Sequence, residues 1–245
     1  GISPVEYFTA VASKLLRTLK EPTRYGILYD VDARLRPDGN KGVLVVTASR
    51  LRDYYLNEAQ AWERLALVKA RFVAGDDAFG KGIGDIVRDL AFDRPLSGDE
   101  LDNIEEIRHK IVAQASPHDL KKGEGGIAEL EFALRLQQIL HGQEHPEVRC
   151  GDALGALEAL ANIGALDKED TARLRDAYIF LRRLENRVRM MHGRAGSGLP
   201  SSPEERDDLA RRLRINGDLA GLTDMHKANV HTVYDKVFQS LRARA

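Results

Sequence analysis

The chain has 245 residues, of which 43% are hydrophobic and 31% are charged. This composition is that of a globular protein, and the length allows one large domain or two small ones. With 37 basic and 38 acidic residues the net charge is −1, so no global field favours a nucleic acid or an anionic membrane as a partner. Cys150 is the single cysteine, which excludes an internal disulfide, and no apolar run is long enough to cross a bilayer. We therefore expect a soluble, cytoplasmic protein with no nucleic-acid or membrane partner.

The first 47 residues contain the β-rich part of the sequence. Residues 4–20 repeat apolar side chains at helical spacing behind Ser3-Pro4, and predict an amphipathic helix. Residues 26–35 alternate polar and apolar side chains and predict a strand, and residues 43–47 predict a second strand after a turn at 37–42. Two strands alone are marginal in water, so they cannot form a self-sufficient sheet.

The rest of the chain has the apolar periodicity of helices. We expect helices over residues 49–70, 77–91, 98–114, 126–141, 151–163, 168–192, 203–214 and 218–241. The Gly- and Ser-rich segment 193–202 predicts a mobile loop. The predicted fold is mainly α (α+β), with a short α+β domain over residues 1–75 and a helical bundle domain over residues 76–245.

The strand at residues 26–35 carries the first candidate site. Alternation places the carboxylates of Asp30 and Asp32 on one face, and Arg34 and Arg36 continue the same row. Carboxylates on a rigid strand suit Mg²⁺, and cations beside them suit a polyphosphate. Taken alone, however, an Asp-x-Asp pattern is more often the solvated polar face of an edge strand.

Longer motifs point to a family. Residues 29–44 resemble the segment "VDxRLRPxGxxGxL" of glutamine synthetase adenylyltransferases. Three further stretches resemble motifs of that family, in the same order and at plausible spacing: residues 54–76 ("YY…WERxALxKAR…GD"), residues 119–132 ("DIKxxxGGIxDIEF") and residues 178–200 ("LRRLENR…LP"). The resemblance covers nearly the whole chain.

The resemblance implies a polymerase-β-type nucleotidyltransferase. In this family a Gly-Ser turn, an Asp-x-Asp pair and a third carboxylate on a neighbouring strand hold two Mg²⁺ ions. Asp32 is the counterpart of the third carboxylate, while Asp30 has a weaker claim to the metal. No Gly-Ser followed by Asp-x-Asp precedes Asp32. One carboxylate supplies too few oxygens for two ions, so we expect this chain to be inactive alone. Its start at Gly1 rather than Met suggests an excerpt.

The segment 121–126 is a second candidate site. Two lysines precede Gly125 and Gly126, which open a predicted helix whose N-terminus would favour anions. Such a loop is more often a solvated connector, but the resemblance implies nucleotide binding by Lys121, Gly125 and Gly126. Glu131 matches the more characteristic family position and is expected to face the active site, whereas Glu129 lies on another side of the helix.

Two other patterns carry less information. The histidines lack a spacing that suggests a zinc site. The arginine-rich residues 182–189 fit a solvated, ion-paired helix face, with contact to a protein partner as the alternative.

Enzymes of the family carry two related modules. One transfers AMP from ATP to a tyrosine of glutamine synthetase, the other removes it by phosphorolysis, and a PII-type signal protein biases the balance. Residues 26–37 favour the adenylylating module. The resemblance then implies that Asp32 helps to hold Mg²⁺ at the α-phosphate of ATP, while Arg34, Arg36 and Lys121 neutralise phosphate charge. The alternative is a non-catalytic helical module that docks glutamine synthetase or the PII-type signal protein.

Overall fold

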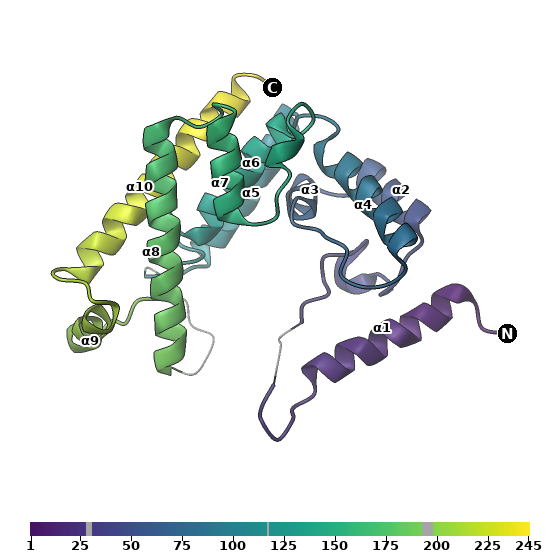
Figure 1. The fold of residues 1–245 in the computed structure, drawn as a ribbon, viewed down its shortest axis with the longest axis horizontal. Helices are drawn as coiled ribbons and strands as arrows, with labels where there is room; N and C mark the ends of the chain where they lie inside the picture. Colours follow the sequence, from purple (N-terminus) through teal and green to yellow (C-terminus); the bar gives the residue numbers. More distant parts are fainter. Residues whose placement is uncertain (28–30, 117, 193–197) are drawn as a thin grey trace.

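The computed structural model describes residues 1–27, 31–116, 118–192 and 198–245, and its described elements are almost all helical (Figure 1). In chain order they are α1 (Pro4–Lys20), η1 (Gly39–Lys41), α2 (Ala48–Asn57), α3 (Ala61–Leu67), α4 (Asp77–Phe92), α5 (Gly98–Ala113), α6 (Ile127–His141), η2 (Pro146–Val148), α7 (Ala153–Asn162), α8 (Lys168–His192), α9 (Pro203–Leu213) and α10 (Leu219–Arg242). The prediction of a mainly α protein with a helical bundle is confirmed.

Polar residues at the helix starts explain why the predicted boundaries are close to the observed ones. Ser97, for example, accepts a hydrogen bond from the backbone of Glu100 while Glu100 reaches back to the backbone of Ser97, which satisfies two free amides at the start of α5. One predicted helix, 49–70, is divided into α2 and α3. The division occurs because Gln60 and Glu63 form a second capping box inside the apolar pattern.

The two strands predicted at residues 26–35 and 43–47 are not formed in the described part of these segments. Instead, Thr23 and Gly26 form an isolated bridge, and residues 36–42 fold into a tight turn around η1. The alternating pattern therefore predicted the wrong local structure here. A strand needs a neighbour to satisfy its backbone groups, and the described residues offer these segments no sheet to join.

The core of the bundle lies between α6, α8 and α10. Apolar side chains from α3 to α8 and from α10 form the larger cluster, in which Ile104, Leu136 and Val233 are fully buried. A second cluster lies beneath the start of α6, where Leu120 and Ile127 pack with residues of α8 and α9. The segment 119–126, which contains the second candidate site at residues 121–126, is therefore held against the bundle by the apolar residues at its two ends.

Helix α1 differs from the other helices because none of its residues is buried. It lies apart from the bundle (Figure 1), and large apolar side chains such as Phe8, Val11 and Leu15 are about half exposed. In the described part of the chain, no helix combines the length and hydropathy that crossing a membrane requires. Half of the predicted loop 193–202, residues 193–197, lies outside the described residues.

Candidate functional site

Asp32 forms a local ion pair with Arg34. The Arg34 Nε lies 2.9 Å from both carboxylate oxygens of Asp32, and Nη2 lies 2.5 Å from Oδ2. The backbone N–H of Arg34 donates to the same carboxylate at 2.9 Å. These hydrogen bonds lower the pKa of Asp32 to about 2, although its side chain is half exposed. Asp32 is therefore an anion at neutral pH, and the Arg34 guanidinium binds both of its carboxylate oxygens.

Arg36 does not join this pair. Its guanidinium donates to the carbonyl oxygens of Ala33 and Gly42, and so holds the turn around η1 together. Asp30, the other carboxylate of the predicted row, lies outside the described residues. Whether the row contacts a phosphate stays a prediction, but in this structure Arg36 serves the local backbone.

The described residues do not fit a two-ion magnesium site. Among them, no group of three or more His, Cys, Asp or Glu side chains could hold a metal ion. Asp32 supplies a single carboxylate that a guanidinium already occupies, whereas Mg²⁺ takes six oxygens, several of them from water or phosphate. The described residues alone therefore support no chemical step through a metal.

The glycine loop, residues 119–126, folds onto itself. The Asp119 carboxylate accepts the backbone N–H groups of Lys121 at 2.8 Å and Lys122 at 2.7 Å. The amides of Gly126, Ile127 and Ala128 donate to carbonyl oxygens of Gly123, Leu120 and Lys121, respectively. The first amides of α6 are thus engaged within the protein, while the side chains of Lys121 and Lys122 are exposed. Anion binding here would depend on the lysine side chains rather than on free helix N–H groups.

The two glycines of the loop are required by close packing. Gly125 has φ of +66°, and its N–H donates to the Glu129 carboxylate at 2.9 Å. A β-carbon on Gly126 would lie 2.7–3.0 Å from three carbonyl oxygens of the loop. Gly125 and Gly126 therefore have a structural role that does not need a nucleotide, and their predicted contact with one remains untested.

Glu131 is the centre of a cluster of charged residues on the other side of α6. Its carboxylate lies 2.8 Å from Lys69, 2.6 Å from Arg135 and 2.8 Å from Arg182. Burial alone would raise its pKa, but the Lys69 ammonium and the two guanidinium groups outweigh burial and hold the pKa below its usual value. Glu131 thus joins α6 and α8 to Lys69, the second residue after the end of α3. The predicted nucleotide contact of Glu131 stays a prediction.

Glu129, which the sequence pattern did not favour, faces the glycine loop. It is 2% exposed, and its Oε1 lies 2.6 Å from Nδ1 of His231. Its other oxygen accepts the Gly125 amide and lies 3.5 Å from Nη1 of Arg108. Arg108 in turn pairs with Glu105, which accepts a hydrogen bond from Tyr234. This buried network joins α5, α6 and α10 behind the loop.

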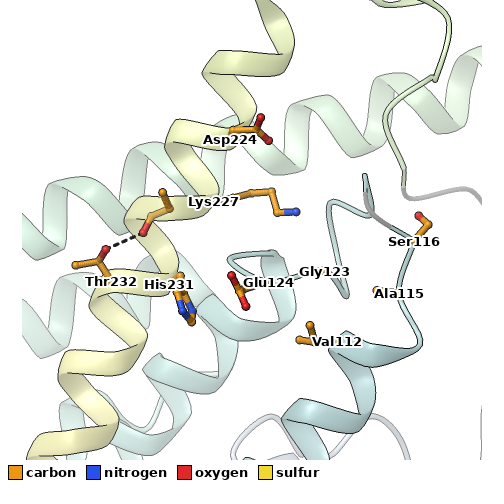
Figure 2. Close-up of a pocket in the computed structure, with 10 residues that line it drawn as sticks. Val112, Ala115, Ser116, Gly123, Glu124, Asp224, Lys227, His231 and Thr232 are labelled. Atoms are coloured by element: carbon orange, nitrogen blue, oxygen red, sulfur yellow. Dashed lines mark hydrogen bonds between the residues drawn. The ribbon is translucent and has the colours of Figure 1, made fainter.

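A cavity of about 530 Å³ opens beside this network (Figure 2). It lies between the C-terminal end of α5, the glycine loop and one face of α10. Lys227 and His231 are one helical turn apart and contribute an ammonium group and an imidazole ring to its wall, while Glu124 and Asp224 contribute carboxylates. The lining residues are Val112, Ala115, Ser116, Gly123, Glu124, Asp224, Lys227, Ala228, His231 and Thr232.

The residues of this cavity were missed at the sequence level. No short motif contains Lys227 and His231, and the spacing of the histidines indicates only that they do not form a zinc site. A usable signal existed, because positions 227 and 231 are four apart on one predicted helix and must share a face. The partner of His231, however, lies 102 residues away in sequence, so only the folded chain identifies it.

Two family models match this chain. The first, glutamate-ammonia ligase adenylyltransferase, matches residues 1–83 and includes Asp32. The second, GlnD PII-uridylyltransferase, matches residues 103–241, which is more than half of the chain and includes the glycine loop and the cavity.

Together with the helical fold, these matches define the chain as a nucleotidyltransferase. The chain belongs to the GlnD PII-uridylyltransferase family through its bundle, and its first 83 residues match the model of glutamate-ammonia ligase adenylyltransferase. The resemblance to glutamine synthetase adenylyltransferases seen in the sequence motifs is thereby confirmed.

Proposed function

We propose that this chain is part of an enzyme that transfers AMP from ATP to a tyrosine of glutamine synthetase, or removes it by phosphorolysis. The observation that carries the proposal is the adenylyltransferase match over residues 1–83, because it includes Asp32 and the arginines beside it. The pattern of residues 26–37 favours the adenylylating direction. The enzyme would act in nitrogen assimilation in the cytoplasm, with a PII-type signal protein as a further partner.

The active site would be divided between this chain and another part of the enzyme. Asp32 remains ionised because its pKa is about 2, but it cannot hold two Mg²⁺ ions alone. The Gly-Ser and Asp-x-Asp ligands that accompany such a carboxylate would come from elsewhere in the enzyme, together with the site for ATP. Among the described residues, Asp32 would contribute one negative charge to that site.

The bundle would position the substrates. Lys121 and Lys122 expose their ammonium groups at the start of α6, where they could neutralise phosphate charge once the nucleotide is bound. The loop that carries them is held in place from both sides, by its own backbone hydrogen bonds and by Glu129. A rigid support of this kind favours catalysis by positioning and electrostatics rather than by a covalent intermediate.

A second candidate is a non-catalytic module that docks glutamine synthetase or the PII-type signal protein. The longer of the two matches favours it, since residues 103–241 belong to the PII-uridylyltransferase model and form the bundle without Asp32. Such a module would bind its partner without any transfer of a nucleotide.

A radiolabel assay distinguishes the two candidates. Labelled ATP, Mg²⁺ and glutamine synthetase are incubated with the complete enzyme that contains this chain, as wild type and as Asp32→Asn. The proposal predicts label on the synthetase and a loss of at least 100-fold in its rate with Asp32→Asn. The matched control is Asp38→Asn, a nearby half-exposed carboxylate that pairs with Arg50 and should leave the rate within two-fold. Binding of glutamine synthetase with no transfer, or transfer that ignores Asp32→Asn, would favour the docking module.

A further inference from the structure

Lys227 places an uncompensated positive charge in the wall of the cavity. Its ammonium is 3.5 Å from the carbonyl oxygen of Asp119, and no carboxylate in the described part of the chain lies within ion-pair distance of it. By contrast, Lys236 on the same helix pairs with both Asp167 and Asp170. A cation beside a cavity without such a partner is a ready contact for an anionic group.

His231 adds a second donor on the same face of α10 in its imidazolium form. Burial lowers the pKa of the ring, but the Glu129 carboxylate outweighs burial and raises it, which favours this form. Its Nδ1 lies 2.6 Å from the Glu129 carboxylate, and since a carboxylate only accepts, the proton of this bond belongs to Nδ1. Glu129 is fixed in turn by the Gly125 amide and by Arg108. The ring is therefore held in one orientation, with Nε2 available except for a 3.4 Å contact to Asp235. Figure 2 shows Lys227 and His231 on the side of α10 that faces the glycine loop.

The size and the remaining charges of the cavity restrict its ligand. A volume of about 530 Å³ lies within the range of small-molecule sites. Glu124 and Asp224 also line it and would repel a second anionic group, but each can accept hydrogen bonds from hydroxyl or amino groups. The cavity therefore favours a ligand with one oxyanion and several hydrogen-bond donors, as in a nucleoside monophosphate.

We propose that this cavity is a binding site for such a small metabolite, whose single phosphate or carboxylate group is held by Lys227 and by Nε2–H of His231. Asp32 is not among the residues that line the cavity, and the existence of the site does not depend on the AMP-transfer activity proposed above. Because Glu129 holds both the Gly125 amide and His231, an occupied cavity would be coupled to the glycine loop through a single buried carboxylate.

Calorimetry and NMR of the ¹⁵N-histidine-labelled chain test this site at constant ionic strength. The probes are AMP, inorganic phosphate and acetate, and the His231 resonance is assigned by its loss in His231→Gln. We expect a probe to shift this resonance and to bind at least ten-fold more weakly to Lys227→Met. The matched control, Lys81→Met, removes an exposed lysine of α4 outside the cavity and should change the affinity by less than two-fold. Tighter binding of phosphate than of acetate would identify a phosphate ligand, and the reverse a carboxylate ligand.

A second variant covers the case in which Lys227→Met does not fold. Glu124→Gln removes an exposed carboxylate from the wall and should strengthen the binding of phosphate and AMP by several-fold. If no probe shifts the His231 resonance, the proposal is overturned. It is equally overturned if Lys227→Met binds like the wild type, or if Glu124→Gln weakens binding.

Discussion

The carbonyl oxygen of Lys227 lies 2.0 Å from the position that a β-carbon on Gly125 would occupy. The glycine loop is therefore packed against the backbone of α10 so closely that only glycine fits. Gly125 also has φ of +66°, which disfavours any residue with a side chain. The position of the loop, and with it the position of Lys121, thus depends on Gly125 in two ways: it has no β-carbon, and it adopts a positive φ.

Gly125→Ala should destabilise the chain by about 3 kcal/mol or more, because overpacking adds to the cost of a left-handed backbone. Gly164→Ala is the matched control, since Gly164 has φ of +75° but no atom within 4 Å of the added β-carbon. It should cost only about 1–2 kcal/mol. Urea unfolding followed by circular dichroism measures both values. Equal losses in the two variants would contradict the close packing of the loop on α10.

Glu131→Gln should destabilise the chain by about 2–4 kcal/mol, because it leaves three cations around a mostly buried position without their counter-charge. Glu106→Gln provides the control, since Glu106 forms a fully solvated i,i+4 pair with Lys110. That change should have no measurable effect on the unfolding midpoint. If Glu131→Gln behaved like Glu106→Gln, the cluster would be no more than a surface feature.

His231 should make the stability depend on pH. Burial lowers its pKa, but the hydrogen bond and the charge of Glu129 outweigh burial, so the folded pKa is raised above the usual value near 6.5. The His231 contribution is thus fully present below the unfolded pKa and is lost as the pH rises through the folded pKa.

The measurement is the difference in unfolding free energy between the wild type and His231→Gln at several pH values. This difference should be larger at pH 5.5 than at pH 9. His226 is the control with the opposite sign, because burial lowers its pKa; its contribution should decrease as the pH falls. A His231 difference that does not change with pH would contradict the pairing with Glu129.

Helix α1 should contribute little to the stability of this chain. Leu15 is 58% exposed, so Leu15→Ala should change the unfolding free energy by no more than about 0.5 kcal/mol. Leu181 is fully buried between helices, and Leu181→Ala should cost about 2–5 kcal/mol. Denaturant unfolding of both variants provides the test. A large effect at Leu15 would mean that α1 packs on the bundle in solution.

The helices could be predicted from the sequence because their apolar periodicity and their capping residues agree. Helix α8 begins and ends where the pattern indicates, at Lys168 and His192. The strand predicted at residues 26–35 does not form in the described part of that segment. An alternating pattern indicates that one face is polar, but a stable strand also needs a neighbouring strand to pair with. Strands depend on distant partners, whereas helices satisfy most of their backbone within the segment.

The candidate site was predicted in part. The motif at residues 119–132 directed attention to the glycine loop, and its glycines do have a special backbone role. The sequence could not reveal that the loop amides are satisfied internally, nor that Glu129 rather than Glu131 faces the loop. Both facts depend on how α6 is rotated against α10, and the apolar pattern of α6 does not determine that rotation, since it has buried residues on most sides.

The central claim is that Asp32 is one carboxylate of an active site completed by another part of the enzyme. Calorimetric titration of ATP, with and without Mg²⁺, tests it on this chain and on the complete enzyme, each as wild type and as Asp32→Asn. We predict that this chain alone shows no Mg²⁺-dependent binding, that the complete enzyme does, and that Asp32→Asn abolishes the Mg²⁺-dependent component. Unchanged Mg²⁺-dependent binding by the complete Asp32→Asn enzyme would contradict the claim.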